Sequence, residues 1–311
     1  MDYILGIDSG GTKFLVRACT LSGASLGVFT GTAAGFRFKE LSDGIREVSL
    51  HIDACLAQFM GRREDCRYLV VGSTGIDSTP DYQRIRAVYD SLSGFSCPIW
   101  CGNDSEVAHY AATGGVGVLV ISGTGSVAFG RNKLGEIARS GGWWFTMGAD
   151  EGSGTSIALS ALQHMALVYD SRCEASLLSH MLSDRLRLTD RADLIRIGRG
   201  TWSSWSQYRL PQLVDEAAEK GDHYAKKLLE DASFHTFTLG DSVVKKLEMD
   251  VEESFIVGAW GSAIVKSRLH FEAFTRRFQE KYTHVRVVLP QEDAAMGAVR
   301  MGITFLAGGR L

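Results

Sequence analysis

A pattern of strand, glycine turn and strand occurs twice in this chain, and it constrains the fold more than any other feature. In the first copy, the runs Tyr3–Ile7 and Phe14–Cys19 flank the turn DSGGTK. In the second copy, the runs Val116–Ile121 and Ser126–Phe129 flank the turn SGTG. Short β-favouring runs joined by such turns predict hairpins. Because duplicated domains leave an internal repeat, the sequence predicts an α/β chain of two similar domains.

The best boundary between the two copies is the glycine-containing stretch Ala112–Gly115. Strands are expected near 27–30, 69–71, 99–101, 255–257 and 285–289, and helices at 43–60, 81–92, after 103, over most of 152–247 and at 292–305. We therefore expect one domain at 1–114 plus 292–311. The second domain, 115–291, would carry the helical insertion.

Composition excludes several classes of protein. The formal net charge of the 311 residues is −3, so a bulk electrostatic grip on nucleic acid is not expected. No apolar stretch reaches the roughly 18 residues that span a membrane, and the N-terminus lacks the pattern of a signal peptide. The 6 cysteines form no CxxC pair, which predicts free thiols in a reducing cytoplasm.

The segment Gly6–Lys13 invites comparison with a P-loop, in which the glycine loop and its lysine feed a helix. Here Thr12-Lys13 reverses the required order, and the residues that follow favour a strand. The segment is therefore predicted to be a hairpin whose backbone N–H groups could approach a phosphate, with Thr12 as a further donor. Asp8 would hold the water shell of Mg²⁺. An ordinary glycine hairpin is the alternative.

The turn Ser122–Ser126 repeats this logic in the second half of the chain. Each turn alone is a weak signal. Two glycine-hydroxyl turns at the start of two similar domains predict a pair of loops that grip a polyphosphate.

Asn103-Asp104 stands where a short strand meets a helix. Catalytic groups of α/β proteins gather at the carboxyl ends of strands, which favours Asp104 as a general base toward a substrate hydroxyl. The alternative is that Asp104 is the N-cap of the helix.

The run Gly141-Gly142-Trp143 and the run Asp150–Ser153 suit a sugar site, because carboxylates accept hydrogen bonds from hydroxyls and an aromatic ring covers the apolar face of a pyranose. The alternative is a helix start capped by Asp150 or Ser153. A third glycine-rich run, Val257–Ser262, would let a flat nucleoside lie against the backbone.

Together these motifs resemble the N-acetylglucosamine kinase branch of the BadF/BadG/BcrA/BcrD group, within the sugar kinase, actin and heat-shock chaperone superfamily. The resemblance extends over nearly the whole chain. Its most specific element is GGW followed at short range by DEGS, whereas GIDSGGTK is shared by several branches of kinases.

The resemblance implies two actin-like (ribonuclease H-like) domains with a nucleotide cleft between them. It implies transfer of the γ-phosphoryl group of ATP, with Mg²⁺, to the 6-hydroxyl of N-acetylglucosamine, glucosamine or a close relative. Asp104 would be the catalytic base and Asp8 the metal ligand. Contacts to ATP would come from Gly10, Gly11, Thr12, Lys13, Gly123, Thr124, Gly125, Gly258 and Ser262. Contacts to the sugar would come from Asp77, Asn103, Gly142, Trp143 and Asp150. A homodimer without nucleic-acid or membrane partners is expected.

Two features depart from the family pattern, and both bear on the identity of the sugar. The loop at 33–37 lacks the sugar-contacting Asn, and the segment between Trp143 and Asp150 is one residue longer.

Three rival functions remain. One is a hexokinase of the repressor and sugar kinase (ROK) family, although that family usually has a clustered Cys zinc motif where this chain has Cys173 alone. The others are a BadF-type ATPase activator of 2-hydroxyacyl-CoA dehydratases, which needs cluster-binding cysteines, and a non-catalytic nucleotide-dependent sugar sensor or filament.

Overall fold

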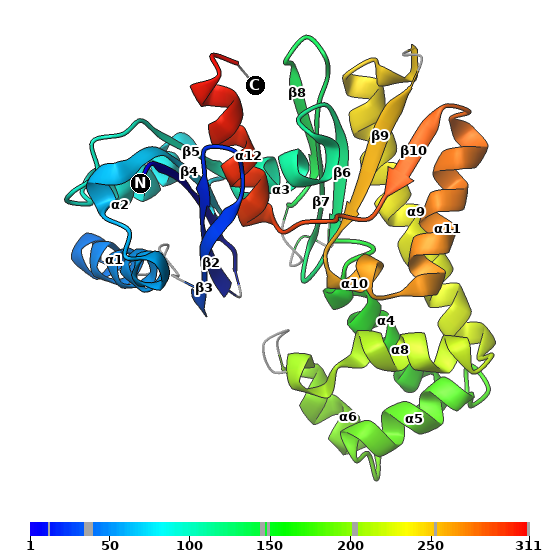
Figure 1. Cartoon of the computed structure of the whole chain (residues 1–311). Helices are drawn as coiled ribbons and strands as arrows, with labels where there is room; N and C mark the ends of the chain where they lie inside the picture. Colours follow the sequence, from blue (N-terminus) through cyan, green and yellow to red (C-terminus); the bar gives the residue numbers. More distant parts are fainter. Residues whose placement is uncertain are drawn as a thin grey trace. The chain divides into compact units, whose positions relative to one another are not determined.

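The computed structural model describes residues 1–11, 13–33, 40–143, 147, 150–200, 205–251 and 254–309. It divides the chain into two compact units, Met1–Gly117 with Pro290–Leu311, and Val118–Leu289. The boundaries expected from the sequence are 114/115 and 291/292. Each unit contains one five-stranded sheet (Figure 1).

The sheet of unit 1 has the order β3-β2-β1-β4-β5. Its strands are β1 (Tyr3–Ser9), β2 (Lys13–Thr20), β3 (Ser25–Thr32), β4 (Cys66–Ser73) and β5 (Ile99–Asn103). β1, β2 and β3 are antiparallel neighbours, whereas β4 and β5 run parallel to β1. The hairpin that the first glycine turn predicts is therefore confirmed.

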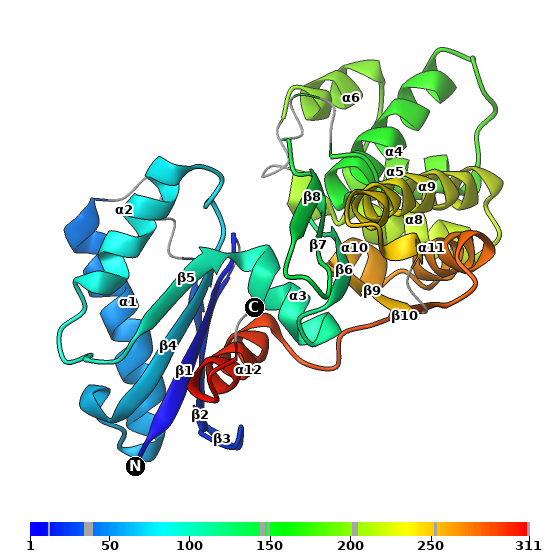
Figure 2. The ribbon, with the colours of Figure 1, turned by 90° about the horizontal axis from the view of Figure 1, so that it is seen from above.

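Helices cover both faces of this sheet (Figure 2). They are α1 (Leu41–Leu56), α2 (Thr79–Asp90), α3 (Asp104–Thr113) and α12 (Ala294–Leu306). Because side chains alternate along β1, Leu5 packs in the cluster that contains Val48 of α1, while Ile4 packs with Val299 of α12. α12 lies directly on α3, since a Cβ at Gly297 would collide with the carbonyl oxygen of Val107.

The sheet of unit 2 has the order β10-β9-β6-β7-β8. Its strands are β6 (Gly117–Ser122), β7 (Ser126–Arg131), β8 (Ile137–Gly141), β9 (Phe255–Trp260) and β10 (Val285–Val288). β9 is parallel to both β6 and β10. Three residues connect β6 to its neighbour β7, which requires an antiparallel pair, and β8 is antiparallel to β7. The carboxyl ends of β6, β8, β9 and β10 thus share one edge.

The helices of unit 2 are α4 (Gly154–Tyr169), α5 (Leu177–Leu186), α6 (Arg191–Gly198), α8 (Leu210–Glu219), α9 (His223–Lys246), α10 (Ser262–Val265) and α11 (Arg268–Lys281). Phe274 and Phe278 of α11 and Val243 of α9 pack with Val120 and Val257 of the sheet. α4, α5, α6 and α8 share a second core, and they lie in the stretch 152–247 that the sequence predicts to be mainly helical. None of the described helices is both long and apolar enough to cross a bilayer.

Candidate active site

In unit 1, the carboxyl ends of three parallel strands bring the predicted acidic residues together. Ser9 of β1 pairs with Ser73 of β4, and Ser73 pairs with Asn103 of β5. Asp8 and Asp104 therefore lie at the same edge of the sheet. A Cβ at Gly72 would lie 3.2 Å from Cα of Asp104, so the start of α3 packs directly on β4.

Asp8 is a buried carboxyl group, with 9% of its surface exposed. Its pKa is raised to about 7, first by burial and then by the charges of Asp104 and Asp293, while Lys13 opposes the rise. A carboxyl group in this state is costly to ionise in the free protein. A cation bound beside it would remove that cost.

Asn103, rather than Asp104, is the N-cap of α3. Its Oδ1 accepts a 3.0 Å hydrogen bond from the backbone N–H of Ser105, and its own backbone N–H donates to Glu106 Oε1 at 3.1 Å. The alternative that Asp104 is the cap is therefore wrong. Asp104 is the first residue of the helix and is half-buried.

The side chain of Asn103 also fixes the loop that follows β4. Its Nδ2 donates a 3.1 Å hydrogen bond to the carbonyl oxygen of Ile76, the residue before Asp77. The predicted sugar ligands Asn103 and Asp77 are thus brought close in unit 1. Because both polar atoms of the Asn103 amide bond to the protein, Asn103 holds the loop in place.

The first glycine turn has room for a ligand. A Cβ built on Gly11 would meet no described atom within 4 Å, and one on Gly10 would meet only ordinary contacts. Neither glycine adopts a positive φ, so the fold itself does not require glycine at either position. Lys13 begins β2 with an exposed side chain, and Thr12 lies outside the described residues.

The second glycine turn also has room for a ligand. A Cβ on Gly123 would meet nothing within 4 Å, and its φ is not positive. The turn is held by its neighbours: Gly154 N–H donates to the carbonyl of Gly123, and Thr155 Oγ1 donates to the carbonyl of Thr124 at 2.7 Å. The sheet edge therefore presents a fixed, uncrowded loop beside the start of α4.

The carboxyl group of Asp150 holds the end of this turn through a hydrogen bond. Its Oδ1 accepts a 3.2 Å hydrogen bond from the N–H of Ser126, and a Cβ on Gly125 would lie 3.1 Å from the same oxygen. Burial raises the pKa of the Asp150 carboxyl group, and the Ser126 N–H partly opposes this rise. Ser153 is the N-cap of α4, so of the two predicted caps only Ser153 fulfils that role.

The GGW motif joins the same cluster. The N–H of Gly142 donates a 2.9 Å hydrogen bond to the carbonyl of Ser126, so Gly142 lies beside the last residue of the second turn. Gly142 has a φ of 72°, a value that favours glycine. Trp143 is 69% exposed, which leaves its ring available to a sugar.

In the third glycine run, Gly258 lies within β9 and is buried between β6 and β10. The glycine at the carboxyl edge of that strand is Gly261, with a φ of 91°. A Cβ there would overlap the carbonyl group of Ser122, so β9 ends directly against the second turn. Ser262 follows as the first residue of α10.

Residues 5–302 match the family model described as the BadF/BadG/BcrA/BcrD ATPase family. The chain belongs to the BadF/BadG/BcrA/BcrD ATPase family. The family resemblance drawn from the motifs is thereby confirmed.

Two curated relatives are kinases. The chain is 33% identical to the N-acetylmuramic acid/N-acetylglucosamine kinase of Clostridium acetobutylicum, over 96% of this chain and 97% of the relative. It is 28% identical to the N-acetyl-D-glucosamine kinase of Dictyostelium discoideum, over 97% and 98% respectively.

Solved structures confirm the predicted fold class, an α/β protein of two actin-like domains. A provisionally named N-acetylglucosamine kinase from Chromobacterium violaceum superposes with a TM-score of 0.76 at 23% identity, covering 96% of this chain and 98% of that one. The ROK-family glucokinase of Streptomyces griseus, solved with glucose and AMPPNP, gives 0.57 at 15% identity, covering 96% and 97%. At these identities the likeness concerns the fold.

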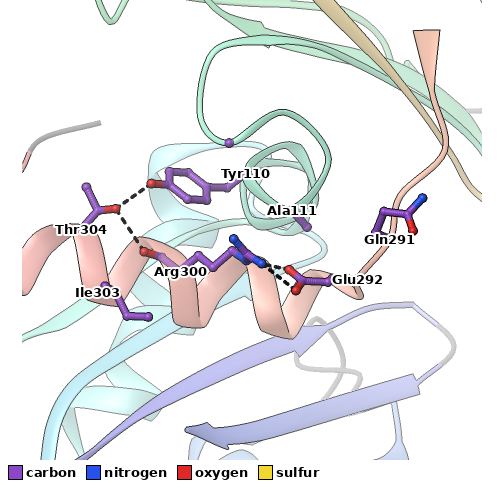
Figure 3. Close-up of a pocket in the computed structure, with 8 residues that line it drawn as sticks. Tyr110, Ala111, Gln291, Glu292, Arg300, Ile303 and Thr304 are labelled. Atoms are coloured by element: carbon purple, nitrogen blue, oxygen red, sulfur yellow. Dashed lines mark hydrogen bonds and ion pairs between the residues drawn. The ribbon is translucent and has the colours of Figure 1, made fainter. Parts of the chain in front are cut away.

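Unit 1 of this BadF-family chain also contains a cavity of about 430 Å³ away from Asp104, between α3 and α12 (Figure 3). Its polar groups pair with one another. Arg300 forms two hydrogen bonds with Glu292, at 2.6 and 2.7 Å, and Tyr110 shares a 2.6 Å hydrogen bond with Thr304. The cavity reaches Gly114 at the end of α3, close to the point where the chain leaves unit 1.

The roles of two residues in these sites were not foreseen from the sequence. Ser126 connects Gly142 to Asp150 through its backbone, a role that residue type does not reveal. Gly261 belongs to the predicted motif Val257–Ser262, but the sequence does not show that β9 ends just before it.

Among the described residues, no group of three or more His, Cys, Asp or Glu side chains is arranged to hold a metal ion.

Proposed function

We propose that this chain is an ATP-dependent kinase that phosphorylates the 6-hydroxyl of N-acetylglucosamine or a closely related amino sugar. The observation that carries the proposal is similarity to two amino-sugar kinases over 96% and 97% of this chain. Two open glycine turns, and the carboxyl groups of Asp8 and Asp104 at one edge of the unit 1 sheet, support it. ATP, the sugar and Mg²⁺ are the expected ligands. Glucosamine is a candidate substrate alongside N-acetylglucosamine.

The two open glycine turns support a role in holding the phosphates of ATP. Gly11 and Gly123 lack side chains at positions where neither backbone strain nor packing calls for glycine. Backbone N–H groups could therefore approach phosphate oxygens closely. We assign Gly10, Gly11, Thr12, Lys13 and the turn at 123–125 to the phosphates. The nucleoside is assigned to the carboxyl end of β9, at Gly261 and Ser262, because Gly258 is buried within the strand.

Asp8 fits the requirements of a magnesium site. Mg²⁺ prefers oxygen ligands and retains several waters, and it neutralises charge on the phosphates when bound. A buried carboxyl group whose pKa is raised to about 7, with Asp104 nearby, gains from an adjacent cation. We assign Asp8 as the residue that holds the hydrated ion.

Asp104 is the best candidate for the general base. It is less buried than Asp8, and Asn103 supplies the cap bond of α3, so that bond is not made by the Asp104 carboxylate. In the reaction its carboxylate would accept the proton of the sugar 6-hydroxyl as that oxygen bonds to the γ-phosphorus, while the bond from the γ-phosphorus to the bridging oxygen breaks and ADP leaves. Asp77, Asn103, Gly142, Trp143 and Asp150 would position the sugar.

All six cysteines are free thiols, which supports action in the reducing cytoplasm. The homodimer suggested by the family resemblance stays a prediction, and sedimentation velocity tests it.

One screen tests the proposed function. ADP release is measured with glucosamine, N-acetylglucosamine, N-acetylmuramic acid, N-acetylmannosamine and glucose, and the position of phosphate is read by NMR. We expect turnover with at least one amino sugar and phosphate on its 6-oxygen. Turnover with glucose alone would favour a ROK-type hexokinase, and ATP hydrolysis without any sugar product would favour the activator class.

A further inference from the structure

Cys66 and Cys97 are neighbours at the amino ends of β4 and β5, the edge of the unit 1 sheet opposite the candidate active site. The pairing of Leu69 with Ile99 begins just after them, and both side chains pack in one core cluster. Neighbouring strands lie about 4.8 Å apart, and disulfides join Cα atoms about 4.4–6.8 Å apart. A bond between the two sulfurs therefore needs little movement of the backbone.

The two thiols differ in exposure. Cys66 is 3% exposed, whereas Cys97 is half-buried, in the segment that leads into β5. A small solute therefore reaches the sulfur of Cys97 first. The Cys66 sulfur is covered by the protein and is accessible chiefly to its neighbour.

Hydrogen bonds favour the thiolate form of Cys97. The bond from the Cys66 thiol is the largest cause that lowers the pKa of Cys97, and the backbone N–H of Leu69 adds to it, while burial opposes both. The same bond, followed by burial, raises the pKa of Cys66. Cys66 Sγ also lies 3.3 Å from the carbonyl oxygen of Tyr68. Its one proton goes to a Cys97 thiolate in preference, because a bond to a charged acceptor is stronger.

The other four of the six cysteines lack this combination. Cys19, Cys55 and Cys101 are buried, and burial raises the pKa of each thiol, to about 11 for Cys55 and about 12 for Cys101. Cys173 is half-buried, but it is the one cysteine in the sequence of unit 2. Its sulfur contacts Nδ1 of His164 at 3.6 Å.

From this placement we infer that Cys97 and Cys66 form a peroxide-sensitive modification site, in which Cys97 is oxidised first and Cys66 then closes a disulfide. An accessible thiolate beside a second, resolving thiol is the arrangement typical of redox-sensing cysteines. Such disulfides are transient in a reducing compartment. The inference concerns a part of unit 1 away from the proposed kinase site and does not depend on that function.

The chemistry has two steps. The Cys97 thiolate attacks one oxygen of hydrogen peroxide, the O–O bond breaks, and Cys97 sulfenic acid and hydroxide form. The Cys66 sulfur then attacks the sulfenic sulfur, the S–O bond breaks, and the hydroxyl group leaves with the Cys66 proton as water. The peroxide gains two electrons, and the two thiols lose them.

Mass spectrometry of the full-length protein tests the inference. The reduced protein is treated with a low molar excess of hydrogen peroxide, the remaining thiols are blocked with N-ethylmaleimide, and the chain is digested without reductant. We expect peptides joined through Cys66 and Cys97, two fewer blocked cysteines, and complete reversal by dithiothreitol. Cys173, which is also half-buried, is the internal control and should stay blocked at the dose that joins the pair.

Variants separate the two roles. Cys66→Ser should leave Cys97 as a sulfenic acid that dimedone traps, because the resolving thiol is gone. Cys97→Ser removes the first reacting thiol, so Cys66 should stay reduced at the same dose. Cys173→Ser is the matched control and should form the disulfide as the wild type does. Melting curves check folding, and the half-buried position of Cys97 keeps the test open if the buried Cys66→Ser does not fold.

Three results would each overturn the inference. One is oxidation of wild-type Cys97 to sulfinic acid with no bond to Cys66. The second is oxidation of Cys66 in Cys97→Ser at the wild-type rate. The third is oxidation of Cys97 and Cys173 at equal rates. In the reduced state, Cys97→Ser should retain the wild-type ADP-release rate, since Cys97 lies at the opposite edge of the sheet from Asp104.

Discussion

Asp104 lies close enough to Asp8 for its charge to raise the pKa of the Asp8 carboxyl group. The two residues come from segments almost a hundred positions apart, and parallel pairing of β1, β4 and β5 brings them to one sheet edge. Their burial differs, since Asp8 is buried and Asp104 is half-buried. This difference supports separate roles, with Asp8 beside the metal and Asp104 beside the sugar hydroxyl.

Asp8→Asn should stabilise the ligand-free protein at pH 8. The folded state raises the pKa of Asp8 from 3.8 to about 7, so the wild type loses stability as pH rises between these two values. Above pH 7 the loss is complete, and we expect a gain of more than about 1 kcal/mol in Asp8→Asn. The gain should vanish near pH 4. Urea unfolding at both pH values without Mg²⁺ measures it.

The same variant should bind Mg²⁺ poorly. If the two unfolding curves shift equally at pH 4 and pH 8, the burial of Asp8 does not control its charge. If Asp8→Asn keeps the wild-type dependence of activity on Mg²⁺, the assignment of Asp8 to the metal is wrong.

Asp104→Asn should lower kcat by about 10²-fold or more, the usual contribution of a general base. ATP and sugar should still bind, because the amide has the shape of the carboxylate. Stopped-flow turnover and calorimetric titration measure the two effects. The neighbour Glu106→Gln is the control: it weakens the bond to Asn103 N–H in the capping box and should change kcat little. A near-normal kcat in Asp104→Asn would remove Asp104 from the chemistry.

Much of the fold was readable from the sequence, because its strands are short apolar runs bounded by glycine turns. The helix expected at 43–60 ends earlier, at Leu56, and a short 3₁₀ turn then carries the chain to Met60. β8 was missed because its sequence, IARSG, lacks apolar alternation: it is an edge strand with exposed and half-buried residues.

The candidate site was only partly readable. Glycine turns and acidic residues after strands identified both loops, since residue type carries that information. The alternative that Asp104 caps α3 could not be separated from a cap at Asn103, because Asn and Asp are both good caps and are adjacent here. The place of Gly142 beside Ser126 depends on the β7–β8 pairing, which residue spacing does not reveal.

Gly11→Val and Gly123→Val should each raise the KM for ATP by at least about tenfold, equal to about 1.4 kcal/mol, because a side chain would fill the space assigned to phosphate. Stability should change by less than about 0.5 kcal/mol, since a Cβ at either position meets no described atom within 4 Å. Gly297→Ala is the contrasting variant. Its Cβ would collide with the carbonyl of Val107, so it should lower Tm. Wild-type nucleotide affinity in Gly11→Val would show that the first turn is only a hairpin.

Asn103 should act by holding the loop that carries Asp77 in place for the sugar. Asn103→Ala removes the cap of α3 and the bond to Ile76, which should cost about 0.5–2 kcal/mol of stability and raise the sugar KM. Asn103→Asp keeps a cap acceptor and loses only the donor to Ile76. If the sugar KM rises as much in Asn103→Asp as in Asn103→Ala, the hold on the Asp77 loop is the important contribution. A wild-type sugar KM in both variants contradicts a role at the sugar.

Asp150 gives the last prediction, because it touches both proposed ligand regions. Its Oδ1 accepts from Ser126 N–H, which supports the second turn, and the residues around it form the proposed sugar loop. Asp150→Asn retains an oxygen that can accept the Ser126 bond, so the KM for ATP and the melting temperature should stay close to the wild type. The sugar KM should rise, since an amide is a weaker acceptor for sugar hydroxyls than a carboxylate.

Asp150→Ala separates the two contributions. It leaves the buried N–H of Ser126 without that acceptor, which should cost about 1–3 kcal/mol and loosen the turn. We therefore expect the KM for ATP to rise in Asp150→Ala and not in Asp150→Asn, with both variants weak toward the sugar. Steady-state kinetics with each substrate varied in turn decides the matter. If Asp150→Asn keeps the wild-type sugar KM while Asp150→Ala loses ATP affinity, Asp150 supports the phosphate turn and does not bind the sugar.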